Sequence, residues 1–252
     1  MADRITALAL DGLPEVRAGD DPATLIATAI PAGAPAPGDV LVVAHKFISK
    51  AEGRTRRLSE VTPGERALAL ADELGKDPRH VQVVLDETRE VRRAERGVLI
   101  SVTHHGFVCA NAGVDASNAP DDDTVILLPR DPDDSARRLR AGLRAALGAA
   151  PAVVITDSFG RAWRHGQCDI AIGCAGLTPL EDWRGRSDNR GRELKATLIA
   201  VADELAAAAD LARAKDAMQP VVLVSGAGRH VTAQDGPGVA PLLRADAEDL
   251  FR

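Results

Sequence analysis

The residues best suited to chemistry lie in one segment, Val153–Gly173, which reads VVITDSFGRAWRHGQCDIAIG. Its β-branched start, Val153–Thr156, predicts a buried strand. A carboxylate, a hydroxyl and a glycine turn follow directly, with Asp157, Ser158 and then Arg161. Carboxylate and hydroxyl oxygens suit a hard divalent cation, and guanidinium groups suit a polyphosphate. The simpler alternative is a strand followed by a solvated polar loop.

A second segment, Phe107–Asn118, has a similar composition and reads FVCANAGVDASN. An apolar approach and a glycine are followed by Asp115 and Asn118, so a carboxylate and an amide meet at a chain reversal. A metal–nucleotide site requires such a pair, although a turn that caps itself would have the same residues.

A third segment is basic and follows an expected strand over 39–44. It reads HKFISKAEGR, from His45 to Arg54, and holds two lysines. Such a cluster at a strand end could bind an anion, and a charged connecting loop is the simpler interpretation.

Strands and helices alternate around these segments. We expect further strands over 4–10, 98–102, 125–128 and 220–225, and helices over 23–30, from 62, from 78, from 132 and over 194–215. Asp21 is the expected N-cap of the first helix, and Thr62 with Glu65 forms a capping-box pattern for the second. The polar loop over 176–191 is expected to be mobile or to wrap on a partner. The pattern predicts a mixed α/β protein, and it lacks the glycine motifs of P-loop and Rossmann nucleotide sites.

Composition limits the class of protein. The 252 residues suffice for one large or two modest domains, and the net charge of -6 with interspersed charges argues against nucleic acid as a partner. Three cysteines without a CxxC pair predict reduced thiols, and no signal or membrane-spanning pattern is visible. We therefore expect a cytoplasmic protein without nucleic-acid or membrane partners.

Taken together, these segments go beyond composition. DGLPEVRAGDD (Asp11–Asp21) precedes the three segments above, and VADELAAAADL (Val201–Leu211) follows them. This ordered set closely resembles the coenzyme F-420-0:L-glutamate ligase family, which uses GTP to add γ-linked glutamates to a deazaflavin cofactor. The resemblance covers nearly the whole chain and is closer to the stand-alone ligase than to the form fused with a nitroreductase-like domain.

The resemblance implies roles for individual residues. The implied metal ligands are Asp115, Asp157 and Ser158, and the implied catalytic residues are Asp157, Lys50 and Arg161. The implied nucleotide-binding residues are Leu13, Pro14, Glu15, Val16, His45, Lys46, Lys50, Asn118 and Lys215. Ser158 stands where the family usually has threonine, and His45 and Lys46 replace small hydroxyl residues of some members. After the long helix a family Gly-Glu pair is missing, so Asp216 could replace the glutamate or Lys215 could bind phosphate directly.

The resemblance also implies an architecture and a reaction. The fold would have two closely joined lobes, about 1–95 with 192–252 and about 96–191, in a homodimer. GTP would phosphorylate the acceptor carboxylate, and L-glutamate would attack the acyl phosphate. The acceptor would be F-420-0, with two Mg²⁺ or Mn²⁺ ions and K⁺ as a candidate monovalent cation. The alternatives are a carboxylate–amine ligase with another acceptor and a non-catalytic nucleotide-binding homologue.

Overall fold

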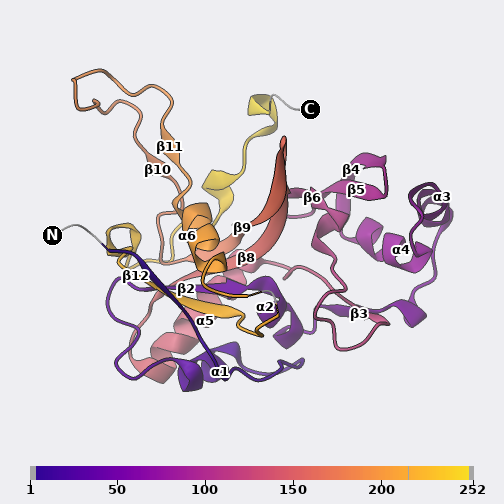
Figure 1. Cartoon of the computed structure of the whole chain (residues 1–252), viewed down its shortest axis with the longest axis horizontal. Coiled ribbons are helices and arrows are strands. Elements are labelled where there is room, and N and C mark those ends of the chain that lie inside the picture. The colour runs from indigo at the N-terminus through magenta and orange to yellow at the C-terminus, as the bar shows by residue number, and fades with distance from the viewer. Residues whose placement is uncertain (1–3, 215, 250–252) are drawn as a thin grey trace.

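A five-stranded sheet forms the centre of the computed structural model, which describes residues 4–214 and 216–249 (Figure 1). Its order is β1-β12-β2-β8-β9, with β2 and β8 parallel and the other neighbours antiparallel. The strands are β1 (Thr6–Ala9), β2 (Val40–Ala44), β8 (Ala152–Arg161), β9 (Arg164–Ala175) and β12 (Val221–Ser225). The β-branched runs of β2, β8 and β12 are buried because helices cover both faces of the sheet.

Three helices provide that cover. Helices α1 (Pro22–Ala29) and α5 (Pro132–Leu147) pack on each other, and α5 packs on β8 and β9. Helix α6 (Val201–Asp210) contacts all five strands and lies in front of the sheet in Figure 1, with α5 behind it. The expected N-cap of α1 is confirmed, since Asp21 accepts a hydrogen bond from the backbone of Ala23 at 3.1 Å.

A smaller, second core lies beside the sheet. Its helices are α3 (Glu65–Leu74) and α4 (Pro78–Asp86), and its strands are β3 (Thr55–Arg57), β4 (Thr88–Glu95), β5 (Val98–Thr103), β6 (Val108–Ala110) and β7 (Thr124–Ile126). Its largest apolar cluster takes residues from 58–127 only, and the main cluster takes residues from 10–51 and 107–239. The expected lobe limits stay a prediction. The two apolar clusters divide the chain at other positions than those limits.

Short elements complete the chain. Helix α2 (His45–Ala51) follows β2 directly. Short 3₁₀ turns lie at Leu58–Glu60, Asn111–Gly113, Gly228–His230, Ala240–Leu242 and Asp246–Glu248. The prediction of a mixed α/β fold is confirmed. Within the described ranges, no helix combines the length and apolar character needed to cross a bilayer.

Four local predictions are wrong. The basic segment after β2 is a helix and not a loop, since α2 buries one face. No turn follows Thr156, because β8 continues to Arg161 by pairing with β9. The N-cap of α3 is Gly64 and not Thr62, and the backbone N–H of Gly64 donates to the side chain of Gln82 at 2.9 Å. Helix α6 starts at Val201 and not at 194, because the residues before it pair with an earlier strand.

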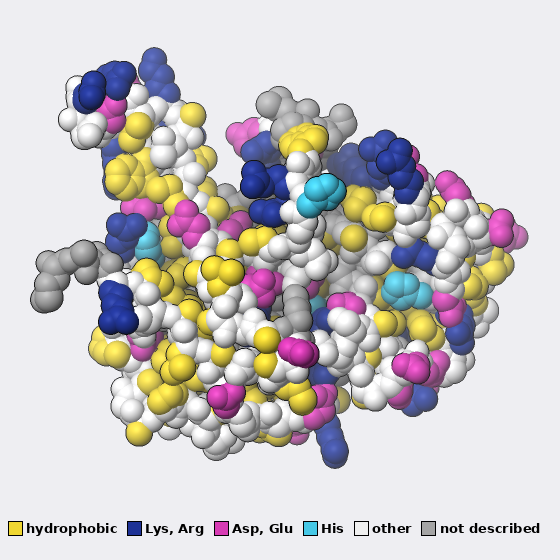
Figure 2. Space-filling model, viewed as in Figure 1, with side chains coloured by type: hydrophobic (Ala, Val, Ile, Leu, Met, Phe, Trp, Pro, Cys, Tyr) yellow, Lys and Arg dark blue, Asp and Glu magenta, His cyan; other side chains and the backbone are white. Residues whose placement is uncertain are grey.

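That pairing creates a projecting arm, defined here as residues 181–199. Strands β10 (Glu181–Asp182) and β11 (Leu198–Ile199) form its base, and its loop extends away from the body of the protein (Figure 1). Basic side chains gather at its tip (Figure 2), and the exposed ones are Arg184, Arg186, Arg190, Arg192 and Lys195. Arg186 stacks on Trp183, with 4.8 Å between the guanidinium carbon and the ring centre.

Candidate functional site

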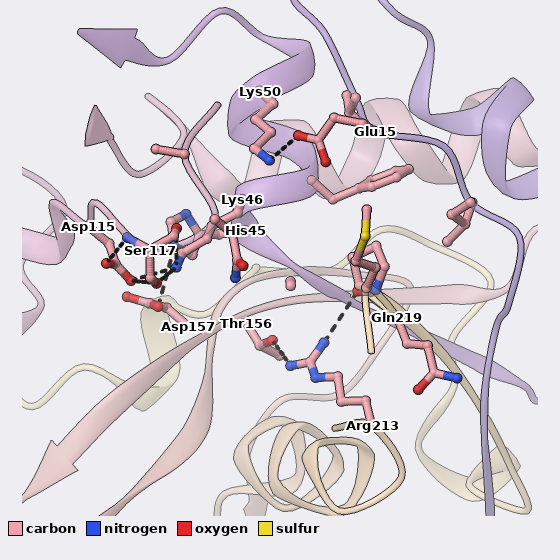
Figure 3. Close-up of a pocket in the computed structure, with 18 of the residues that line it drawn as sticks. Glu15, His45, Lys46, Lys50, Asp115, Ser117, Thr156, Asp157, Arg213 and Gln219 are labelled. Carbon is pink, nitrogen blue, oxygen red and sulfur yellow. Dashed lines mark hydrogen bonds and ion pairs between the residues drawn. The ribbon is translucent and has the colours of Figure 1, made fainter. Parts of the chain in front are cut away.

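A cavity of about 950 Å³ opens where β2 and β8 end (Figure 3). Its wall draws on chain segments that are far apart in the sequence, within 13–18, 44–50, 115–120, 156–169 and 210–220. Most of the implied site residues line it: Leu13, Pro14, Glu15, Val16, His45, Lys46, Lys50, Asp115, Asn118, Asp157 and Ser158. The fold therefore brings residues of the three segments that could do chemistry, and of the Asp11–Asp21 segment, to one place.

The parallel pairing of β2 with β8 explains part of this convergence. Ala44, the last residue of β2, pairs with Thr156, so the two strands end their pairing at the same level. Beyond that point β2 turns into α2, and β8 continues with Asp157 and Ser158 past the end of its neighbour. Carboxyl ends of adjacent parallel strands commonly form the floor of a ligand site in α/β proteins.

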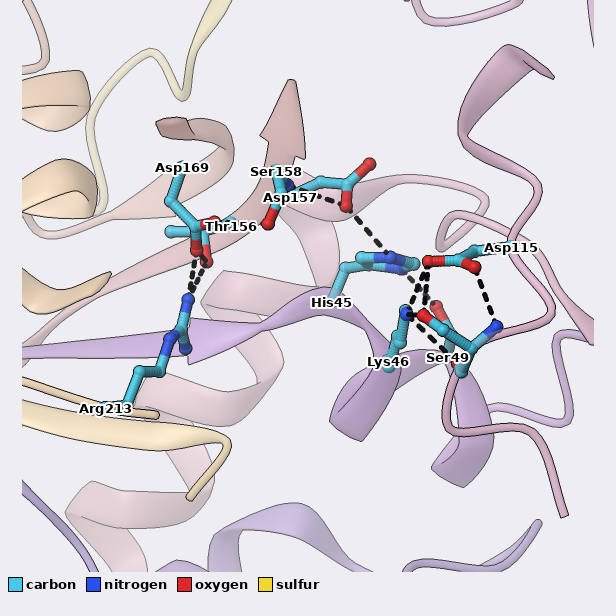
Figure 4. Close-up of polar contacts among 10 residues, drawn as sticks. His45, Lys46, Ser49, Asp115, Thr156, Asp157, Ser158, Asp169 and Arg213 are labelled. Carbon is cyan, nitrogen blue, oxygen red and sulfur yellow. Dashed lines mark hydrogen bonds and ion pairs between the residues drawn. The ribbon is translucent and has the colours of Figure 1, made fainter. Parts of the chain in front are cut away.

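His45 connects the two strands at the cavity floor (Figure 4). The side chain is 2% exposed, its Nε2 lies 3.3 Å from Asp157 Oδ1, and its Nδ1 lies 3.3 Å from Ser49 Oγ. Asp157 Oδ1 also accepts a hydrogen bond from the backbone N–H of Ser158 at 2.8 Å. The Ser158 N–H thus anchors one oxygen of the Asp157 carboxylate at the cavity wall, and the His45 imidazole lies beside that oxygen.

Lys46 bridges to the second core. Its Nζ lies 2.5 Å from Asp115 Oδ2 and also donates to the carbonyl oxygen of Ser117 at 3.0 Å. Burial by itself would raise the pKa of Asp115, but hydrogen bonds from Lys46 and Ser117 and the Lys46 charge hold that pKa below its usual value. Asp115 is therefore an ionised group with a cation beside it. On the other wall, Lys50 contacts Glu15 (Figure 3).

A strained turn delivers Asp115 to the cavity. Asn111, Ala112 and Gly113 have successive φ angles of 52°, 51° and 73°, in the left-handed region. A Cβ on Gly113 would lie 2.6 Å from Cγ of Leu128, so only glycine fits there. Such a conformation costs about 1–3 kcal/mol per non-glycine residue and is concentrated at functional sites.

The sequence interpretation missed two residues of the site. Asp169 on β9 is 2% exposed and accepts hydrogen bonds from Ser158 Oγ at 2.6 Å and Thr156 Oγ1 at 2.8 Å. Arg213, after α6, forms a buried ion pair with the same carboxylate (Figure 4). The polar Asp169 inside an otherwise apolar strand, CDIAIG, was the available signal.

Two implied residues remain, Arg161 and Lys215. Arg161 is exposed at the end of β8, donates to the carbonyl oxygen of His165 at 2.8 Å and does not line the cavity. Lys215 lies outside the described residues. Asp216, one of the two candidates for the role of the missing family glutamate, lines the cavity.

The donor set fits a hard cation that arrives with phosphate. Among residues 4–214 and 216–249, no three His, Cys, Asp or Glu side chains gather closely enough to complete a metal site alone. Mg²⁺ usually takes one or two protein carboxylates and completes its shell with water and phosphate oxygens. Asp115 and Asp157 supply two carboxylates on one cavity, and the Lys46 ammonium already places positive charge at Asp115.

Comparisons with known proteins agree with this arrangement. The model of the F420-0:Gamma-glutamyl ligase family matches residues 12–226. Coenzyme F420:L-glutamate ligase of Methanothermobacter thermautotrophicus is 44% identical over 98% of this chain and 99% of its own. The protein of the same name from Methanopyrus kandleri is 44% identical over 94% of this chain and 94% of its own. That from Halobacterium salinarum is 45% identical over 98% of this chain and 95% of its own.

A cavity with paired carboxylates and lysines, in a chain with such relatives, defines an enzyme of the ligase class that forms carbon–nitrogen bonds. The matches extend over nearly the full length of the chain and of its relatives. The chain belongs to the F420-0:gamma-glutamyl ligase family.

Proposed function

We propose that this enzyme adds L-glutamate in γ-linkage to coenzyme F-420-0, with GTP as co-substrate. The observation that carries the proposal is the single cavity that gathers Asp115, Asp157, Lys46 and Lys50 from segments distant in the sequence. The names of the relatives, each a coenzyme F420:L-glutamate ligase, supply the acceptor and the amino acid.

The reaction needs an activated carboxylate, because a carboxylate and an amine do not condense at neutral pH. A carboxylate oxygen of the acceptor attacks the γ-phosphorus of GTP, and GDP leaves with the bridging oxygen. The amine of L-glutamate then attacks the acyl carbon, loses a proton and expels phosphate. Phosphoryl transfer depends mostly on positioning and charge neutralisation.

The residues of the cavity can supply both positioning and charge neutralisation. Lys46 and Lys50 carry positive charge to a bound polyphosphate, which would compete for them with Asp115 and Glu15. Residues 13–16 form the wall next to Lys50, where a nucleotide would lie. Arg161 and Arg164 extend beyond the cavity on the β8–β9 hairpin and suit the phosphodiester and carboxylates of the acceptor.

Two divalent cations, Mg²⁺ or Mn²⁺, complete the proposal. Asp115 and Asp157 would hold one ion and Ser158 would contact the other, because oxygen donors suit hard cations. When bound, such ions neutralise phosphate charge and align the reacting oxygens. The backbone N–H of Ser158 donates to the Asp157 carboxylate, and the His45 imidazole lies beside it.

We also propose that the enzyme is a homodimer that uses the arm as part of its interface. An isolated two-stranded hairpin is marginally stable in water, and the base of the arm has only two residues in each strand. A partner surface would stabilise the projecting loop.

The test of the ligase activity is release of GDP by the purified protein supplied with GTP, Mg²⁺ or Mn²⁺, L-glutamate and F-420-0. Each component is omitted in turn, and the product is weighed by mass spectrometry. We expect GDP release to require both acceptor and glutamate and the product to be heavier by glutamyl units. GDP release that needs no acceptor, or an acceptor preference for another carboxylic acid, would contradict the proposal.

A further inference from the structure

The hairpin of β8 and β9 extends past the other strands of the central sheet (Figure 1). Strand β2 pairs with β8 only as far as Thr156, whereas β8 and β9 stay paired beyond that level. All residues of the hairpin end, defined here as 160–167, are exposed. Below it, Phe159 is buried and meets the ring of Phe107 edge-on, with 6.3 Å between the ring centres. The hairpin end is therefore a projection on an anchored base.

Trp163 lies at the turn of this hairpin and is 80% exposed. Within residues 4–214 and 216–249, no other Phe or Trp side chain is exposed. Its φ angle of 60° lies in the left-handed region, which a bulky residue rarely adopts. Any contact that the indole makes within the hairpin leaves most of its surface to solvent. Packing in the folded chain therefore does not account for a tryptophan at this turn.

The same hairpin carries part of the cavity wall, because Ser158 and Gln167 line the cavity. Gln167 pairs with Gly160 across the hairpin, so the wall reaches the level at which the exposed end begins. Along the strand, the distance from Ser158 to Trp163 is roughly 16 Å at the rise of an extended chain. An elongated molecule with one end in the cavity can therefore reach the indole with its other end.

Two guanidinium groups flank the indole. Arg161 and Arg164 are the last cross-strand pair of the hairpin, one on each side of the turn, and both are exposed. Arg161 donates to the carbonyl oxygen of His165 at 2.8 Å, which braces the turn. An anionic group between the cavity and the indole would lie near these cations. The hairpin end thus combines a planar apolar surface with positive charge beside it.

We propose that Trp163 binds the aromatic ring of the acceptor by stacking while the acceptor carboxylate lies in the cavity. The inference rests on the proposed acceptor, which joins a planar deazaflavin ring to a carboxylate through a phosphodiester. The indole, the two arginines and the cavity match these three parts in the same order. Stacked aromatic rings bury a large apolar area in a defined geometry. Trp163 is then a specificity-determining residue, because a carboxylic acid without a ring cannot make this contact.

The test is the binding of F-420-0 to the full chain without GTP, measured by calorimetry and by quenching of tryptophan fluorescence. Trp163→Ala should weaken binding about 10-fold, since removal of a stacked aromatic side chain commonly has an effect of this order. Trp163→Phe should keep most of the affinity. Trp183→Phe is the matched control, because it removes the other tryptophan, which lies in the arm and does not line the cavity. It should leave affinity and quenching unchanged.

A second measurement uses an acceptor fragment that keeps the phosphodiester and the carboxylate but lacks the ring. An NMR titration should give the same affinity of this fragment for the wild type and for Trp163→Ala, because the fragment cannot stack on the indole. If the variant weakens the fragment as much as it weakens F-420-0, the substitution disturbs the cavity itself. That result overturns the inference.

The remaining outcomes separate the inference from the proposed function. Unchanged binding of F-420-0 by Trp163→Ala overturns the inference, while acceptor-dependent GDP release by the wild type leaves the proposed function intact. Conversion of Trp163→Ala from dimer to monomer with unchanged affinity for F-420-0 would show that the indole is a contact between two copies, and also overturns it. A wild type that binds no F-420-0 would contradict the proposed acceptor and the inference together.

Discussion

At the scale of residues, a small number of contacts positions the two carboxylates of the site. Asp157 Oδ1 has the buried imidazole of His45 beside it and accepts a hydrogen bond from the backbone N–H of Ser158. Asp115 is held by Lys46 and by the N–H of Ser117, which donates at 2.7 Å. Each carboxylate is therefore positioned before any ligand arrives, which reduces the entropy that binding must overcome.

Asp157→Asn should reduce turnover by at least about 100-fold, because in its proposed role the carboxylate would hold a cation that neutralises charge in the transition state. The shape of the side chain is kept and Asp157 is not the centre of a buried network, so the melting temperature should change little. GDP release and thermal unfolding measure the two effects. Unchanged turnover would contradict the role of Asp157 as a metal ligand.

Lys46→Met removes an ammonium group that would contact phosphate, so it should weaken the binding of GDP by about 10-fold. A 10-fold change corresponds to about 1.4 kcal/mol of binding free energy. Calorimetry of GDP binding in the presence of Mg²⁺ is the measurement. Lys76→Met is the control, since Lys76 precedes α4 and does not line the cavity. Equal effects of the two variants would show a general loss of charge and not a contact.

Most of the charged residues that line the cavity were predicted from the sequence. The others could not be predicted, because no local pattern places them at the site. Asp115 and Asp157 stand out as acids at the end of apolar runs. Asp169 becomes a site residue only because β9 folds back on β8 and places it opposite Ser158. Arg213 reaches that carboxylate from another part of the chain. Long-range pairing of this kind cannot be derived from one segment.

At the scale of elements, α4 offers a test of an N-terminal cap. Asp77 accepts from the backbone N–H of Arg79 at 2.8 Å and forms an ion pair with its side chain. Hydrogen bonding from Arg79 lowers the pKa of Asp77 to about 2. Because this folded-state pKa is lower than the ordinary value of 3.8, the stabilisation is complete above about pH 4 and is lost as pH falls towards 2.

Asp77→Ala should therefore lower the free energy of unfolding by about 1 kcal/mol at pH 7. The difference from the wild type should shrink between pH 4 and pH 2. Urea denaturation across this range is the measurement, with Asp77→Asn as the variant that keeps a cap without charge. A difference that is constant with pH would show that ionisation of Asp77 is irrelevant.

Elements were predicted well where a cap or a buried apolar run marked them. Asp77 with Pro78 and Asp131 with Pro132 start α4 and α5 as expected. Helix α2 was missed because its seven residues are too few for a clear period and its lysines suggested solvent. Packing against the core stabilises this helix instead, since α2 buries His45, Phe47 and Ile48.

At the scale of the whole molecule, the arm leads to a prediction about assembly. Replacement of residues 185–195 by two glycines should convert a dimer to a monomer, because the deleted loop would contribute to an interface of about 1,200 Å² or more. Light scattering after size-exclusion chromatography measures the mass. A monomeric wild type, or a variant that stays dimeric, would contradict the proposed role of the arm.

The position of Asp115 has a consequence for the energetics of the whole chain. Val114 beside it belongs to the second core, whereas Asp157 and His45 extend from the central sheet. A ligand that contacts both sides binds only when both cores are folded, so it stabilises the weaker core by RT ln(1 + [L]/Kd). Amide hydrogen exchange in α3 and α4 should slow when the cavity fills, although neither helix lines it.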